Sequence, residues 1–428
     1  MELDHFGVLA IVALSVVYVW TLYNIPILAA GVRHLRRSSR KREEGSLLSM
    51  ESLPMISIVV PVKDEEKVVD RLLRALLRLD YPPEKMEILI VEDGSSDRTV
   101  EICMEYVRRY PLQVRLLHKP VSNGKPSALN YALKHAKGEI LAFFDADNVP
   151  EPDTLQRVIR YFGDSSVAAV QGRLCVINAD ENMLTKFVSY EEAAWCEAYL
   201  RGKDALNLFV HLKGSCQFIR RSVLEKLNGF DEEALSEDIE LSARLTEMGY
   251  RIKYASDVRS WQETPSNIKQ VFMQRVRWFR GTMEVAFRYG RLMVKPSRRS
   301  LDAELTLIGP FMLIASLVSY FLALYTSLFA FNFDFLLNFL MQFSAVVTTI
   351  TLGICGLALV YASKPWRISN ILWVPFVYFY WSLQAFISLY AMLLIVFHRP
   401  KKWFKTGKNG VIANSAYKGL EGSFEARQ

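Results

Sequence analysis

The sequence predicts an α/β domain with a parallel, doubly wound sheet, joined to α-helical segments long and apolar enough for a membrane. Between residues 54 and 147, short apolar runs alternate with amphipathic segments, which is the pattern of strands joined by crossover helices. Polar or acidic residues follow three of these runs directly. The 51% hydrophobic content gathers in four long uncharged runs elsewhere in the 428 residues, and a chain of this length has room for two or three domains.

The first long apolar run, 6–32, can cross a bilayer, which needs roughly 20 apolar residues. It is too long for a signal peptide and has acidic residues before it, so we expect a membrane helix over 1–33. Basic residues beside a span mark the cytoplasmic side, so the next domain is predicted to be cytoplasmic. A basic linker is expected over 34–54. The basic residues after the run are Arg33, Arg36, Arg37, Arg40, Lys41 and Arg42.

The α/β domain is predicted over 55–266. Its expected strands lie at 56–62, 87–91, 114–117 and 139–144, with helices at 64–79, before 110 and at 124–137. Ligands bind at the carboxyl ends of the strands in such a sheet. Three of these ends are polar, at 63–65, 92–93 and 145–147, and their convergence predicts a nucleotide site.

Asp145 and Asp147 follow the most apolar of these strands, and period-two alternation is expected to place both on one side of an extended backbone. Two adjacent carboxylates repel each other unless a cation lies between them. Hard oxygen ligands of this kind favour Mg²⁺ or Mn²⁺, which usually also hold substrate phosphates. A solvated acidic turn is the alternative for an isolated pair.

The pattern becomes more helical from 152 to 254, with a long segment at 181–207. Ser236 is predicted to be an N-cap, which places Glu237 and Asp238 in the first turn of a helix. A basic, aromatic helix is expected at 267–290. Residues 267–300 are predicted to form interfacial amphipathic helices along the membrane surface.

Three more apolar runs, 305–333, 335–363 and 369–397, predict a membrane region over 301–398. Three full crossings would put the basic tail, 399–428, on the side opposite the catalytic domain, against the positive-inside rule. The last run, which contains Pro375, is therefore predicted to be partly interfacial or re-entrant.

Composition argues against several other functions. The net charge of +7 gathers beside the apolar runs and not on a soluble helix, which disfavours nucleic-acid binding. The five cysteines form no C-x-x-C pair, so we expect reduced, buried thiols and neither a zinc site nor a disulfide scaffold, and none of the six histidines is assigned to a metal. The cysteines are Cys103, Cys175, Cys196, Cys216 and Cys355.

Six motifs occur in order: Val60-Pro-Val-Lys-Asp-Glu, Val91-Glu-Asp-Gly-Ser-Ser-Asp, Gly124-Lys-Pro-Ser-Ala-Leu-Asn, Asp145-Ala-Asp147, Glu237-Asp238 and Gln274-Arg-Val-Arg277-Trp278. This series resembles the membrane-bound glycosyltransferase family 2, which includes the cellulose, chitin, hyaluronan and poly-N-acetylglucosamine synthases. The resemblance covers about 55–290. It implies a GT-A-like nucleotide-sugar-binding domain and an inverting, metal-dependent glycosyltransferase.

The resemblance also implies roles for individual residues. Glu92 and Asp93 would lie at the uracil and ribose of the donor, although the family usually has two aspartates here and a helix N-terminal turn would look similar. Lys125 would pair with the donor phosphate or sugar, with a solvated lysine as the alternative. Asp145 and Asp147 would hold the diphosphate through Mg²⁺ or Mn²⁺. The donor-binding residues expected in all are Pro61, Lys63, Glu65, Glu92, Asp93, Lys125, Asp145 and Asp147.

Asp238 is the expected general base and Glu237 its neighbour in the catalytic pair, since inverting transfer needs a carboxylate to take the proton of the acceptor hydroxyl. Helix N-terminal charge complementarity is the alternative for both. The acceptor and diphosphate residues implied are Gln274, Arg275, Arg277 and Trp278. Trp403 and Thr406 resemble a W-x-x-T gating loop of the processive synthases, or an interfacial anchor of tryptophan and lysine.

Three functional hypotheses follow. The leading one is a multi-pass cell-membrane enzyme with a cytoplasmic catalytic domain, which moves sugar from a nucleotide-sugar donor, a UDP-sugar, to a growing β-linked polysaccharide. The second is single transfer to a membrane lipid or polyprenyl phosphate. The third, a non-catalytic membrane scaffold, predicts loss of Asp147, Asp238 or Arg277, and all three are present. The sugar, the acceptor hydroxyl, processivity and the oligomeric state are left open.

Overall fold

The computed structural model describes residues 5–38, 53–290, 297–329, 335, 338–346, 349–350, 374–401, 405–414 and 417–418. The chain divides into two compact units, each of which is built from separate stretches of sequence. The first comprises Met1–Pro26, Phe272–Phe287 and Leu305–Lys401. The second comprises Ile27–Val271, Arg288–Glu304 and Lys402–Gln428.

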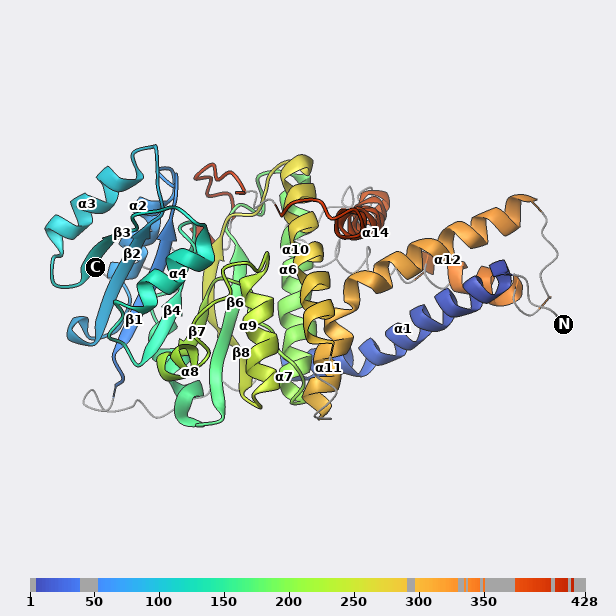
Figure 1. Cartoon of the computed structure of the whole chain (residues 1–428), viewed down its shortest axis with the longest axis horizontal. Coiled ribbons are helices and arrows are strands. Elements are labelled where there is room, and N and C mark those ends of the chain that lie inside the picture. Colours follow the sequence, from blue (N-terminus) through green and yellow to red (C-terminus); the bar gives the residue numbers. More distant parts are fainter. Residues whose placement is uncertain are drawn as a thin grey trace. The chain divides into compact units, whose positions relative to one another are not determined.

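The second unit contains an eight-stranded sheet with the order β3-β2-β1-β4-β7-β6-β8-β5 (Figure 1). The first four strands in this order are mutually parallel. The strands are β1 (Ile56–Val62), β2 (Met86–Glu92), β3 (Val114–His118), β4 (Ile140–Phe143), β5 (Val149–Pro150), β6 (Val167–Val176), β7 (Gln217–Arg220) and β8 (Arg251–Gln262).

Helices cover both faces of the parallel half. Alternate residues of β1, from Ile56 to Val62, share one buried cluster with α2 (Val69–Leu77), α3 (Thr99–Arg109) and α5 (Thr154–Ile159). α4 (Lys125–Leu133) packs against β1 and β2 with buried residues that lie outside this cluster. Strands buried on both faces read as continuous apolar runs, which is why this half was predictable from the sequence.

The four strands predicted from the alternating runs are parallel as expected, whereas the complete sheet is mixed because later strands join it. β7 runs antiparallel to both β4 and β6, and β5 runs antiparallel to β8. β6 and β8 lie in the part of the chain that was expected to be more helical, and they pair in parallel. β8 exposes alternate polar residues, and β6 contains Gln171, Gly172 and Arg173, so neither is a plain apolar run.

The helical part of the second unit begins with α6 (Met183–Ala194), whose Asn182 and Thr185 form a capping box. A π-helical turn, Trp195–Leu200, and α7 (Arg201–Ala205) continue it. The end of α1 (His5–Ser38) approaches these elements closely, because a Cβ atom on Gly31 would lie 1.9 Å from Ala198 O. The remaining helices are α8 (Arg221–Lys226), α9 (Glu237–Glu247) and α11 (Arg298–Leu307), with 3₁₀ turns at Pro83–Lys85 and Arg160–Gly163.

The first unit is helical. α10 (Ile268–Tyr289) packs against α14 (Val374–Val396), with Val276 against Ile387 and Ala391. α12 (Gly309–Phe329) receives a hydrogen bond from α14, between Ser388 Oγ and Pro310 O at 2.7 Å. α12 also packs against the start of α1, where Ala10 and Leu14 contact Ala323.

Among the described residues, two helices are long and apolar enough to cross a membrane, at Val8–Leu35 and Phe379–Val396. A third span is possible by composition if Arg298–Leu307 and Gly309–Tyr325, which meet at 51°, are counted as one. The bend therefore lies in the second apolar run. The prediction that the last run, which contains Pro375, is partly interfacial or re-entrant stays a prediction. Pro375 lies in the described part of α14, Val374–Val396. The predicted run at 335–363 falls largely outside the described residues.

Candidate active site

The register of the parallel strands brings three acidic strand ends together. Val62 at the end of β1 pairs with Glu92 at the end of β2, and Val59 pairs with Phe143 at the end of β4. The residues that follow, 63–65, 93–97 and 144–148, therefore emerge from the same edge of the sheet. The sequence prediction that these ends converge is confirmed.

The end of β1 is shaped by Asp64, which has a φ of 52° and is one of the few non-glycine residues in the left-handed region. Its Oδ1 accepts from Ser96 N at 2.7 Å, and this hydrogen bond lowers the pKa of Asp64. The next residue, Glu65, is partly buried. Burial, with a contribution from Asp147, raises the pKa of Glu65 to about 7, and Lys405 opposes the shift. Lys63 is exposed and donates to Ser122 Oγ at 2.9 Å, while Pro61 is half-buried on β1.

The carboxylates of Glu92 and Asp93 make hydrogen bonds and ion pairs within the protein. Glu92 is 1% exposed, accepts a hydrogen bond from Ser95 N and pairs with His118 Nδ1 at 2.7 Å. Asp93 accepts from Lys119 Nζ at 3.2 Å and from Gly124 N at 3.1 Å, so it ties the end of β2 to the loop before α4. These contacts position the loop, and they leave the carboxylate of Glu92 facing away from solvent.

Asp145 and Asp147 do not share one side of an extended backbone, and that prediction was wrong. β4 ends at Phe143, and Asn148 N donates to Asp145 O at 3.0 Å, which closes a turn that leads into β5. The turn gives the two carboxylates different partners. Asp145 pairs with Lys125 Nζ at 2.7 Å, whereas Asp147, which is 3% exposed, pairs with Lys408 Nζ at 2.5 Å.

Lys125 joins the two groups of acids that the sequence singled out. Besides Asp145, its Nζ lies 3.4 Å from Glu237 Oε1 and donates to Gly214 O at 3.0 Å. Burial disfavours the charged lysine, but Asp145, Glu237 and Asp238 outweigh it and raise the pKa of Lys125. Asp145, which is expected to bind the donor, and Asp238, the expected general base, are therefore in one electrostatic cluster.

Glu237 and Asp238 begin α9, as predicted, although Ser236 makes no capping hydrogen bond with its side chain. Asp238 Oδ1 accepts from Ile239 N at 2.9 Å. A Cβ atom on Gly214, which has a φ of 77°, would lie 3.3 Å from both Asp238 Oδ2 and Lys125 Nζ. Glycine at 214 thus keeps the space beside the presumptive base open and supplies the backbone conformation.

Two buried glutamines hold the loop that carries Gly214. Gln171 Nε2 donates to the carbonyls of Ser215 and Cys216, and its oxygen accepts from Lys213 N at 2.8 Å. Gln217 Oε1 accepts from Gly214 N at 3.2 Å. The loop in turn places Ser215 Oγ to accept from Asp145 N at 3.0 Å. Sequence reasoning missed these residues, since an isolated glutamine in a strand carries no pattern.

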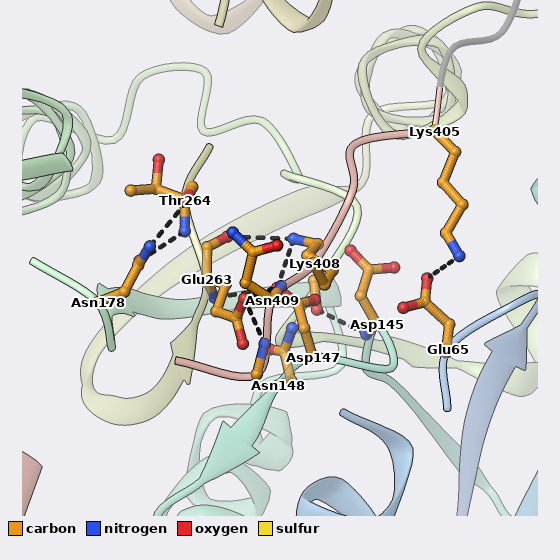
Figure 2. Close-up of polar contacts among 12 residues, drawn as sticks. Glu65, Asp145, Asp147, Asn148, Asn178, Glu263, Thr264, Lys405, Lys408 and Asn409 are labelled. Carbon is orange, nitrogen blue, oxygen red and sulfur yellow. Dashed lines mark hydrogen bonds and ion pairs between the residues drawn. The ribbon is translucent and has the colours of Figure 1, made fainter. Parts of the chain in front are cut away.

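The C-terminal segment 405–414 lies over the same acids, and Figure 2 shows how its lysines point into them. Lys405 pairs with Glu65 Oε1 at 3.1 Å. Lys408 also donates to Glu263 O at 3.1 Å. The neighbouring amides of Asn409 and Gly410 donate to Glu263 Oε2, at 3.0 and 3.3 Å. The basic tail had been predicted, but the entry of its lysines into the acidic site was not.

The motif residues Gln274, Arg275, Arg277 and Trp278 lie on α10 in the first unit. There the guanidinium of Arg275 lies 4.4 Å from the centre of the Trp278 ring. The same helix is tied to the segment after α14, because Arg280 donates to the carbonyls of Arg399 and Pro400. Trp403 is outside the described residues, and Thr406 is half-buried beside Lys405. Their roles in acceptor binding and gating stay predictions.

The donor set around Asp147 suits a divalent cation that takes its other ligands from phosphate and water. Within the described residues no three acidic, histidine or cysteine side chains are grouped as a complete metal site. Asp147 Oδ2 and Glu263 O nevertheless already hold a cationic group, the ammonium of Lys408. Carboxylate and carbonyl oxygens are the ligands that Mg²⁺ and Mn²⁺ prefer.

Residues 54–281 match the family model described as glycosyltransferase like family 2. The chain belongs to this family. It is 33% identical over 300 residues to the Bacillus subtilis (strain 168) protein named probable glycosyltransferase YdaM, covering 69% of this chain and 70% of that one. The six motifs that suggested the family lie within or immediately beside the matched residues.

Two further relatives have more specific names. The beta-monoglucosyldiacylglycerol synthase of Trichormus variabilis is 33% identical over 61% of this chain and 57% of its own. The poly-beta-1,6-N-acetyl-D-glucosamine synthase of Staphylococcus epidermidis is 30% identical over 58% of this chain and 59% of its own. This family 2 chain therefore spans a little under three fifths of the length of each.

The fold has a solved counterpart. The mannosyltransferase PcManGT from Pyrobaculum calidifontis, in complex with GDP-Man and Mn²⁺, superposes with a TM-score of 0.58 at 19% identity, over 91% of this chain and all of that one. The expected GT-A-like fold is thereby confirmed, with a mixed sheet at its centre.

Proposed function

We propose that this family 2 glycosyltransferase transfers a sugar with inversion from a nucleoside-diphosphate sugar to an acceptor hydroxyl at a membrane. The observation that carries the proposal is the cluster around Lys125, which joins Asp145 on the donor side to Glu237 and Asp238 on the acceptor side. A UDP-sugar is the donor we expect. The mannosyltransferase counterpart holds a nucleotide sugar and Mn²⁺, which supports the donor class.

In this proposal each residue has a separate role in a direct displacement at the anomeric carbon. Asp238 accepts the proton of the acceptor hydroxyl as its oxygen bonds to the anomeric carbon. The bond from that carbon to the diphosphate breaks, and the diphosphate leaves with the electron pair. Lys125, which pairs with Asp145, would balance the charge of the leaving group.

Asp145 and Asp147 would hold Mg²⁺ or Mn²⁺. The metal, when bound, would stabilise negative charge on the leaving diphosphate. The hydrogen bond from Asn148 N to Asp145 O closes the turn at 145–148, and the hydrogen bond from Glu263 N to Asp147 Oδ2 at 3.0 Å holds the side chain of Asp147. Arg277 and Trp278 keep the diphosphate and acceptor roles that the family resemblance implies for them, and an arginine can bind diphosphate oxygens bidentately.

The acceptor we propose first is a growing β-linked polysaccharide. Support comes from the Gln274-x-x-Arg277-Trp278 and Trp403-x-x-Thr406 motifs and from the relative named poly-beta-1,6-N-acetyl-D-glucosamine synthase. Single transfer to a membrane lipid is a second candidate, favoured by the relative named beta-monoglucosyldiacylglycerol synthase. Both place a catalytic unit on the cytoplasmic face of a multi-pass membrane protein, with α1 and α14 as spans.

One experiment tests the proposal. The purified full chain in detergent is incubated with radiolabelled UDP- and GDP-sugars and Mn²⁺ or Mg²⁺, with and without added lipid, and the products are sized. A β-linked product from an α-linked donor is expected. Long products support the polysaccharide, and a single sugar on lipid supports the second candidate. Transfer from none of the donors, or retention of configuration, would contradict the proposal.

A further inference from the structure

The C-terminal segment is joined to Asp147 by a closed ring of contacts through Glu263. The main chain of Glu263 touches both members of the Lys408–Asp147 pair, since its N–H donates to Asp147 Oδ2 and its carbonyl accepts from Lys408 Nζ. Its carboxylate accepts from the amides of Asn409 and Gly410 and pairs with Arg71 at 2.9 Å. Arg71 closes the ring with a hydrogen bond to Asp147 O at 3.3 Å.

The ring is largely shielded from water, so its charges interact more strongly than they would in solvent. The side chain of Glu263 is 3% exposed and that of Lys408 is 17% exposed. Burial disfavours the charged form of Lys408, yet Asp147, Asp145 and Glu65 together raise its pKa. The ammonium is thus the counter-ion of a group of carboxylates. Figure 2 shows Lys408 and Asn409 between Asp147 and Glu263.

We propose that Lys408 is a built-in counter-ion that competes with a divalent cation for Asp147, and that Glu263 is the positioning residue that holds Lys408 there. Both cations would use the carboxylate of Asp147, so binding of one would weaken binding of the other. The competition is reciprocal, because a coupling free energy acts equally in both directions. A cation at Asp147 therefore loosens the turn at 408–410, and docking of that turn withholds Asp147 from the metal.

This inference rests on the proposed function, in which Asp147 is a metal ligand. The proposal does not require segment 405–414 to move away from the second unit, because Lys405 and Asn414 hold the segment through contacts of their own. Lys405 pairs with Glu65, and Asn414 Nδ2 donates to Val176 O at 2.7 Å. The exchange is confined to the turn at 408–410, whose hydrogen-bond partners among the described residues are Glu263, Asp147 and Ser266.

The first test measures Mn²⁺ binding to the full chain in detergent, without donor, by electron paramagnetic resonance. Lys408→Gln should tighten Mn²⁺ binding about tenfold, within the usual range of coupling between two ligands. Lys405→Gln is the matched control, since it removes an ammonium from the same segment that contacts Glu65 and not Asp147. Its effect should stay near twofold, as expected for a neighbouring charge. Equal effects of the two variants would overturn the proposal.

The second test measures hydrogen exchange of the Asn409 and Gly410 backbone amides. This readout does not depend on enzymatic activity. Glu263→Gln should speed their exchange about tenfold or more by removing a charged acceptor, and adding Mn²⁺ should speed it in the unsubstituted chain. Glu87→Gln, which changes an equally buried carboxylate at the start of β2, should leave both amides unchanged. Unchanged exchange in Glu263→Gln would overturn the positioning role.

The two proposals fail in different ways. If the unsubstituted chain and Lys408→Gln both bind no Mn²⁺, the metal-assisted function and the competition fall together. If Mn²⁺ binds and supports transfer but Lys408→Gln binds it no more tightly, only the competition is wrong.

Discussion

Two buried lysine–carboxylate pairs in the same unit have similar geometry and different surroundings. Lys203 pairs with Asp302 at 2.8 Å, between α7 and α11, with side chains 0% and 3% exposed. Lys408 pairs with Asp147 at 2.5 Å. Burial lowers the pKa of Lys203 although Asp302 opposes the shift, whereas Asp147, Asp145 and Glu65 together raise the pKa of Lys408. In the first pair the charge of one ammonium offsets that of one carboxylate. The second pair belongs to a site with excess negative charge.

The difference indicates what each pair does. Lys203 and Asp302 form an ion pair away from water, and Asp302 also accepts from Phe209 N at 2.8 Å. A surplus of carboxylates attracts cations and phosphate-bound metals. We therefore expect substitutions near Lys203 to reduce stability and substitutions near Lys408 and Lys125 to reduce activity.

The largest expected effect is the loss of transfer in Asp238→Asn. Removing the base while keeping the shape should lower kcat by roughly 10²–10⁴-fold. The melting temperature should change little, because Asp238 is only partly buried and the asparagine oxygen can still accept from Ile239 N. Kinetics and a thermal melt on the same preparation check both. Turnover close to that of the unsubstituted chain would mean that the base is another group.

The next effect is on stability, where Asp302→Ala should leave the Lys203 ammonium buried without its carboxylate. Breaking such a pair costs about 3–5 kcal/mol. Asp147→Ala should cost less, since Lys408 retains Glu263 O and the nearby Asp145 and Glu65. Chemical denaturation in detergent compares the two variants. Equal losses would remove the distinction between a structural pair and an exchangeable one.

The third prediction concerns pH. The pKa of Glu65 is raised to about 7, so the folded state binds the proton more tightly than the unfolded chain does. Stability from this group is therefore lost as pH rises from about 4.5 to about 7, by at most roughly 3 kcal/mol. Melting temperatures across this range should fall less steeply in Glu65→Gln. Glu66→Gln, an exposed neighbour, is the control and should keep the original slope.

The smallest effect is expected for Gly214→Ala. Alanine at a φ of 77° costs roughly 1–2 kcal/mol, and its Cβ would press on Asp238 and Lys125 at 3.3 Å. The rate of transfer should fall further than the loss of folding free energy alone would explain, because the displaced groups, Asp238 and Lys125, belong to the site. Gly249→Ala has a similar φ of 81° with no atom within 4 Å of its Cβ, and it isolates the backbone cost. Equal loss of activity in both would show that space at 214 is unimportant.

Much of the site could be read from local pattern. The apolar runs of β1, β2 and β4 fixed where three strands end, and parallel pairing then had to bring 63–65, 92–93 and 145–147 to one edge. The N-terminal ends of α9 and α10 were also predicted from the local pattern of their residues. The turn after Phe143 was missed, because a D-x-D segment reads equally well as extended chain.

The sequence by itself determined the family, the parallel half of the sheet, the acidic strand ends and the apolar helices, since each depends on residues close together in the chain. Only the tertiary structure decided that Lys408 pairs with Asp147 and Lys203 with Asp302, across 261 and 99 residues. Any lysine can pair with any carboxylate, so charge alone selects no partner. The path of the backbone brings these particular groups together and excludes water from them.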